Sequence, residues 1–158
     1  RVSHALLTEP GVSLALRKTQ SFPVGLVAPT LHRGADLQQE WGRVFARAPR
    51  LPQAGIAAVG ALREQPAVLA AVAQAYARSV AWCRAYPMEC GQMMHQHIDL
   101  LTPEAVADAV ATSQLDAVPA LAARGDLEFF FTQLMARNAA LVGGKLPEAG
   151  FYAAPASA

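Results

Sequence analysis

The chain has 158 residues, 53% of them hydrophobic and 16% charged, which predicts a globular protein with one buried core. Its formal net charge is +1, with 13 Lys and Arg residues against 12 Asp and Glu residues and no basic stripe, so we expect no nucleic acid partner. Charged residues interrupt every apolar stretch before the roughly 18 to 20 residues that a membrane-spanning helix needs, so we expect no transmembrane segment.

Two short apolar runs have the character of buried strands. Residues 3–8 (SHALLT) end at the turn signal Glu9-Pro10-Gly11, and residues 55–61 (GIAAVGA) contain β-branched side chains between chain breakers. Two strands about fifty residues apart do not make a stable sheet alone. They predict either a small mixed sheet covered by helices or pairing with sequence outside this chain.

Most of the remaining chain has the apolar periodicity of helices. Asp36 and Thr102 can cap helices, and Pro66 stands near the first helical position, where proline is favoured. Asp126 is expected to cap a last helix that ends at Gly143. The sequence therefore predicts a helix-rich α/β fold, with helices near 37–46, after Pro66, at 88–97, after Pro103 and after Asp126.

The two cysteines, Cys83 and Cys90, lie on either side of Pro87. On one continuous helix their Cα atoms would be about 10 Å apart, too far for a disulfide. Because Pro87 disfavours helical geometry at Tyr86, a disulfide can form across a corner between two helices. The more common state of such a pair is two buried thiols that act as small apolar side chains, and the disulfide is the alternative.

Soft metal ligands are concentrated between residues 86 and 97 (YPMECGQMMHQH). Cys90, Met94 and His95 are the candidates, and such a set suits copper(I). His95 and His97 would point to different faces of a helix, so they cannot chelate one ion together without unwinding it. We therefore expect no metal site, with a metal-handling protein as the alternative.

No catalytic motif is evident. The chain contains no G-x-S-x-G, G-x-G-x-x-G, G-x-x-x-x-G-K-[ST] or H-E-x-x-H pattern. A nucleophile at Cys83 or Cys90 would need a base such as His95 together with oxyanion donors that the helical corner does not offer. We expect neither enzymatic activity nor a cofactor. Glu9 is of interest because it follows a predicted strand, where open α/β sheets bind ligands.

Three strings, in order along the chain, resemble segments of one protein family. Residues 6–15 (LLTEPGVSLA) resemble its LxEPxxSxA segment, and residues 36–42 (DLQQEWG) followed by 50–56 (RLPQAGI) resemble its DLQxEWG and RxPQAGI stretch. Residues 138–152 (NAALVGGKLPEAGFY) resemble its NPxxxGGxLPxxxFY terminus, with Ala139 where the family often has proline. The family is that of the solute-binding proteins of ABC importers of the nitrate, sulfonate, taurine and thiamine-precursor type.

The resemblance implies part of a type II periplasmic-binding-protein fold, in which two α/β lobes enclose a ligand. The chain looks like the second half of such a protein, with residues 1–35 forming the end of the distal lobe and the hinge return. Residues 36–158 would then form the C-terminal part of the first lobe. The resemblance implies ligand contacts at Thr8, Glu9, Pro10, Gln53 and Gly55.

The function implied is capture of a small organic or oxyanion solute and its delivery to an ABC permease in the inner membrane. Glu9 would favour a cationic or hydrogen-bond-donating group on that solute. The protein is expected in the periplasm after export, and an uncovered sheet face would favour a homodimer. The alternatives are a periplasmic metal-handling protein and an enzyme of the thiamine-precursor branch of the same fold.

Overall fold

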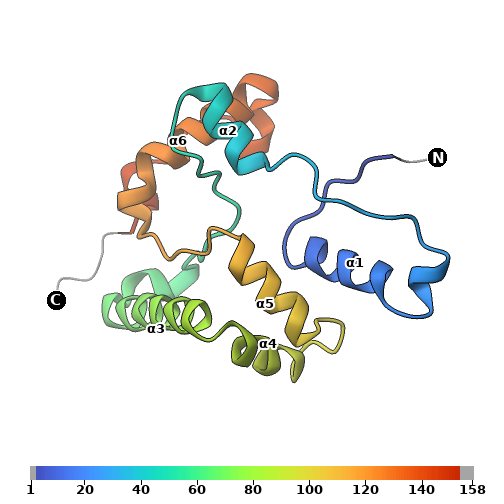
Figure 1. Cartoon of the computed structure of the whole chain (residues 1–158). Coiled ribbons are helices and arrows are strands. Elements are labelled where there is room, and N and C mark those ends of the chain that lie inside the picture. Colours follow the sequence, from blue (N-terminus) through green and yellow to red (C-terminus); the bar gives the residue numbers. More distant parts are fainter. Residues whose placement is uncertain (1–2, 154–158) are drawn as a thin grey trace. The chain divides into compact units, whose positions relative to one another are not determined.

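The structure is a computed structural model that describes residues 3–153 (Figure 1). The described residues form helices joined by turns and extended segments, and none of them lies in a β-strand. None of the described helices combines the length and the apolar character needed to cross a membrane. The α-helices are α1 (Gly11–Gln20), α2 (Leu37–Phe45), α3 (Pro66–Ala85), α4 (Pro87–His95), α5 (Pro103–Thr112) and α6 (Ala120–Arg137), and the 3₁₀ turns are η1 (Val24–Leu26), η2 (Gly60–Glu64), η3 (Ala139–Val142) and η4 (Ala149–Phe151).

The predicted α/β fold, part of a type II periplasmic-binding-protein fold with a small mixed sheet, is therefore wrong for the described residues. Residues 3–8 and 51–59 are extended, but they pair with no other segment, and residues 60–64 form η2 instead of a strand end. Leu6, Ile56 and Val59 are 79%, 65% and 71% exposed. A strand becomes stable when a neighbour satisfies its backbone groups and a layer covers its apolar side, and apolar composition alone supplies neither.

The helices predicted near 37–46, after Pro66, at 88–97 and after Pro103 are confirmed, with ends that differ by a few residues. The last helix differs more. α6 begins at Ala120, after Pro119, and Asp126 lies inside it, where its carboxylate pairs with arginines instead of capping. The helix ends at Arg137, because Asn138 leaves helical geometry and its side chain caps η3 through the N–H of Ala140.

The described chain divides into two compact units. The first consists of the residues up to Asp36 together with Arg78–Asp116, and the second of Leu37–Ala77 together with the residues from Ala117 onward. The first unit therefore holds α1, η1, the end of α3, α4 and α5. The division of the chain at residues 35 and 36 into parts of two lobes stays a prediction.

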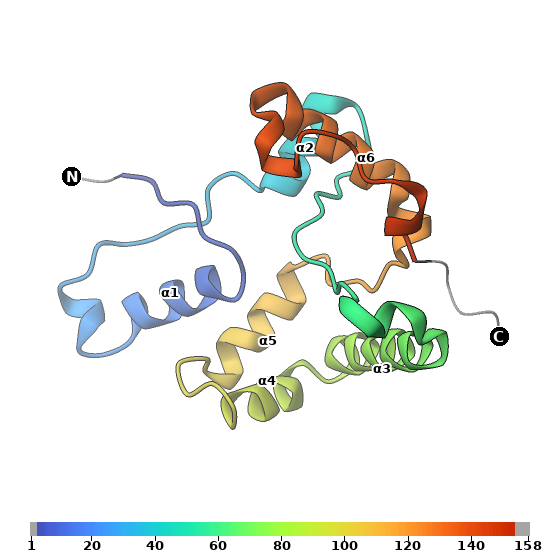
Figure 2. The same cartoon turned by 180° about the vertical axis from the view of Figure 1, so that it is seen from behind.

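In the first unit, α4 packs along α5, as both views show (Figures 1 and 2). The approach is close because α4 presents Gly91 to the backbone of Pro103, where a Cβ atom would lie 2.4 Å from the carbonyl oxygen. α5 starts at this point, since Pro103 takes its first position and the Thr102 hydroxyl accepts a hydrogen bond from the N–H of Ala105 at 3.3 Å. Among the described residues of the first unit, the buried hydrophobic side chains are Val80, Cys90, Ala105, Val106 and Ala109.

The second unit is held by aromatic side chains of α2 and α6. Trp41 and Phe45 of α2 contact Phe129, with ring centroids 5.7 and 5.3 Å away. The guanidinium of Arg47 lies 4.2 Å from the centre of the Phe129 ring and 3.1 Å from the carboxylate of Asp126. Aromatic rings of both helices therefore meet in one cluster, and the guanidinium of Arg47 covers its edge.

Candidate functional site

A polar network in the first unit centres on Glu9, at the turn before α1. Pro10 precedes the helix and has no side-chain hydrogen-bonding group, so the first N–H groups of α1 need another acceptor. Glu9 supplies it: its Oε2 accepts a hydrogen bond from the N–H of Ser13 at 3.1 Å. The carboxylate also faces the positive end of the helix dipole, which favours its charged form.

Arg33 completes this half of the network. Its Nη1 lies 2.6 Å from Oε1 of Glu9, and its Nη2 donates to the Ser13 hydroxyl at 2.9 Å. The side chain of Glu9 is only 19% exposed, and this partial burial works to raise its pKa. The N–H of Ser13 and the guanidinium of Arg33 outweigh the burial, and the pKa of Glu9 lies below its usual value.

A second ion pair joins α1 to α5. Arg17 donates from Nε and Nη2 to the two carboxylate oxygens of Asp108, at 2.5 and 2.8 Å. This hydrogen bonding from Arg17 holds the pKa of Asp108 below its usual range. The Thr112 hydroxyl lies 3.5 Å from Oε1 of Glu9, so the two halves of the network touch.

Between these groups lies an open hollow of about 400 Å³, within the range of small-molecule sites. Each guanidinium has five N–H donors, and the ion pairs use only some of them, so donors remain for a bound oxyanion. Leu16 and Ala111 give the hollow an apolar part. Its lining consists of Ser13, Leu16, Arg17, Gln20, Arg33, Asp108, Ala111 and Thr112.

The sequence-predicted ligand residues fall into both units. Thr8, Glu9 and Pro10 form the turn before α1, where the Thr8 carbonyl accepts the N–H of Val12. Gln53 and Gly55 are exposed residues of the extended segment in the second unit. The carboxylate of Glu9 already has an intrachain partner in Arg33, so a ligand cation would have to compete with a guanidinium 2.6 Å away.

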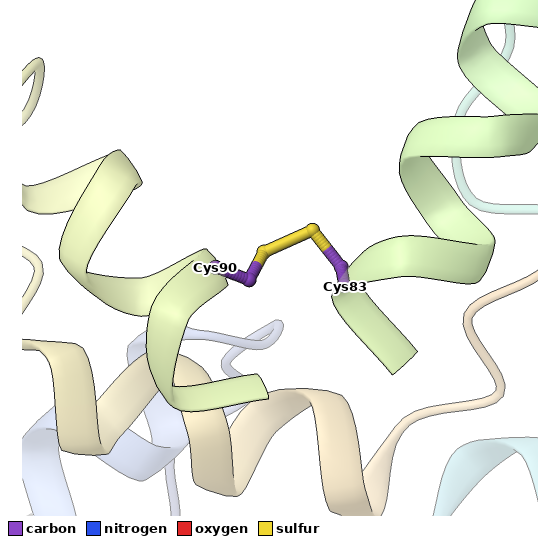
Figure 3. The surroundings of a disulfide bond; sticks show 2 residues. All are labelled: Cys83 and Cys90. Atoms are coloured by element: carbon purple, nitrogen blue, oxygen red, sulfur yellow. A yellow bond between two sulfur atoms is a disulfide. The ribbon is translucent and has the colours of Figure 1, made fainter. Parts of the chain in front are cut away.

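The candidate metal ligands have other partners. Cys90 is bonded to Cys83 at the junction of α3 and α4 (Figure 3). The two Cα atoms are 5.1 Å apart. A bonded sulfur offers no thiolate to a metal. The Nδ1 atom of His95 lies 2.8 Å from the carbonyl oxygen of Leu101, and Met94 is half-buried. Among residues 3–153, no three His, Cys, Asp or Glu side chains are grouped so that they could hold a metal ion.

Several residues of the site had no individual signal in the sequence. Arg17 and Asp108 are 91 positions apart, and neither belongs to a motif. Ser13 stands close to the turn signal at residues 9–11, but its contact with Arg33 depends on the path of the chain between them. The hollow is therefore a product of tertiary structure.

Comparison with known proteins found no matching family model, no similar curated protein and no similar solved structure.

Proposed function

We propose that this chain is a solute-binding component of an ABC importer, and that the hollow beside α1 and α5 holds the solute. One observation carries the proposal: Ser13, from the string that resembles the solute-binding family, lines the hollow, and Glu9 of the same string bonds to Ser13 and to Arg33, which also lines it. The network brings two guanidinium groups to one small cavity, which is a common means of binding oxyanions.

The chemistry of the lining favours a small solute with an oxyanion group and a short carbon skeleton. The carboxylates of Glu9 and Asp108 offset the charges of Arg33 and Arg17, so the hollow is neutral overall and binding would depend on directed hydrogen bonds. Leu16 and Ala111 can contact the carbon atoms of the solute. A sulfonate such as taurine fits this description, and this preference replaces the cationic group that Glu9 alone would favour.

The contacts in the hollow support recognition without bond breaking. The Ser13 hydroxyl accepts a hydrogen bond from Arg33, and a guanidinium cannot take its proton. The Thr112 hydroxyl donates to the Asp108 carbonyl of its own helix, at 2.8 Å. Both hydroxyls have the Glu9 carboxylate as a neighbour, but the lowered pKa of Glu9 makes this carboxylate a weak general base.

The test is a titration of the chain with taurine, methanesulfonate and nitrate, followed by calorimetry and thermal unfolding. A solute at a hundred times its Kd should raise the free energy of unfolding by about 2.7 kcal/mol. Arg17→Gln and Arg33→Gln should each weaken binding by roughly tenfold to a hundredfold, because each removes charged hydrogen bonds. Zinc and copper(I) are added in separate titrations, and a response to them alone would favour the metal-handling alternative.

Arg43→Gln is the matched control. Arg43 also pairs with a carboxylate, that of Glu40 at 2.6 Å, but this exposed pair lies on α2 in the second unit. Its loss should leave binding unchanged. Circular dichroism checks that each variant folds. If Arg33→Gln does not fold, the test relies on Arg17→Gln, because the side chain of Arg17 is slightly more exposed. Equal affinity in Arg17→Gln and Arg43→Gln, or no response to any oxyanion, would contradict the proposal.

A further inference from the structure

The disulfide between Cys83 and Cys90 ties α4 to the end of α3 (Figure 3). α4 has nine residues, fewer than an isolated helix needs to be stable in water. Only two of its residues, Cys90 and Gly91, are buried. The helix therefore depends on two attachments, the disulfide on one side and α5 on the other.

α5 depends on α4 in turn. It has ten residues, and its first position, Pro103, lies against Gly91 of α4. Val106 is buried and stands three positions after Pro103 on the same face of the helix, so these two residues mark the side of α5 that faces α4. If α4 moves away, this side of α5 loses its cover.

The other side of α5 forms part of the wall of the hollow. Asp108 and Thr112 also stand one turn apart, and they contact Arg17 and Glu9. The same short helix therefore rests on α4 with one side and holds the hollow with the other. A continuous series of contacts leads from the disulfide through α4 and α5 to the proposed binding site.

We propose that the Cys83–Cys90 disulfide is a redox-sensitive support of the hollow, so that its reduction disorders α5 and weakens solute binding. The reductant is a dithiol: the S–S bond breaks, each cysteine sulfur gains a proton, and the dithiol is oxidised to its own disulfide. Cys83 is half-buried and Cys90 is 3% exposed, so the thiolate of the dithiol attacks the sulfur of Cys83 and Cys90 leaves. The effect on solute binding rests on the function proposed above, and the effect on α5 does not.

Hydrogen–deuterium exchange on the whole chain, before and after treatment with dithiothreitol and without any solute, tests the structural step. Reduction should raise the exchange rates of the amides of both α4 and α5 by roughly tenfold or more. The amides of α2, in the second unit, are the internal control and should not change. The double variant Cys83→Ser/Cys90→Ser should resemble the reduced chain and should not respond to dithiothreitol.

The outcomes separate the two proposals. Faster exchange in α4 with unchanged exchange in α5 would overturn the redox proposal, because the coupling would stop at the first helix. Two free thiols in the chain after air oxidation would overturn it as well. Titration with taurine then compares the oxidised and reduced chains: weaker binding on reduction supports the coupling to the hollow, and equal binding refutes it. If oxidised protein binds no oxyanion, the proposed function fails while a redox response of α5 still stands.

Discussion

Gly91→Ala places a methyl group in the narrowest contact of the first unit. The new Cβ atom would lie 2.4 Å from the carbonyl oxygen of Pro103 and 2.7 Å from its Cα atom. Both are backbone atoms, so α4 and α5 would have to separate by about 0.6 Å to bring the first distance to 3.0 Å. Overpacking of this kind costs up to about 3 kcal/mol, while alanine gains up to about 1 kcal/mol in helix propensity. We expect a net loss of about 2 kcal/mol in the free energy of unfolding.

Urea unfolding followed by tryptophan fluorescence measures this loss. The chain has two tryptophans, and in a Trp41→Phe background Trp82 reports on the first unit. The control is Gly125→Ala in α6, where no atom lies within 4 Å of the new Cβ, read through Trp41 in a Trp82→Phe background. This second change should stabilise its unit by about 0.5 to 1 kcal/mol through helix propensity. Equal stabilisation by both substitutions would refute the close packing of α4 on α5.

Two further substitutions test the polar contacts. Glu9→Gln should lower the free energy of unfolding at neutral pH. The pKa of Glu9 is depressed in the folded state, so its contribution to stability is present above the ordinary value of 4.5 and is lost as the pH falls through the folded value. An acid titration followed by circular dichroism should therefore show a smaller loss of stability in the variant than in the original chain. An unchanged acid profile would show that Arg33 and Ser13 do not hold this carboxylate. Thr102→Ala should cost about 1 kcal/mol by removing the cap of α5, whereas Thr102→Ser should keep most of it; equal unfolding midpoints in urea would exclude the capping role.

The helices were the part of the fold that the sequence predicted best, because prolines mark where several of them begin. Pro66, Pro87 and Pro103 stand at the starts of α3, α4 and α5, where proline is favoured because it lacks an N–H that would need a partner. These signals act within one turn of helix, so they can be read without knowing the fold. Asp126 shows their limit, because its carboxylate serves an ion pair with Arg47 instead of a cap.

Features that depend on distant residues were not accessible in the same way. A strand needs a partner as well as a suitable composition, and the extended residues 3–8 and 51–59 have none within the described chain. The turn at Glu9 was identified from the sequence, but its partner Arg33 was not, and nothing indicated that Arg17 would meet Asp108. The sequence therefore indicated one residue of the candidate site, Glu9, while its contacts with Arg33 and the pairing of Arg17 with Asp108 became known only from the structure.

The extended segment of the second unit has a practical consequence for work with this protein. Residues 51–62 carry no charged side chain, and Ile56 and Val59 stand exposed on a backbone that has no neighbouring strand. Segments of this kind pair readily with identical copies of themselves, and flanking charges act as gatekeepers against such pairing. Arg50 and Arg63 are the charges that border this segment. Concentrated samples should therefore gain turbidity and thioflavin fluorescence with time, and low salt, which strengthens repulsion between these arginines, should slow both.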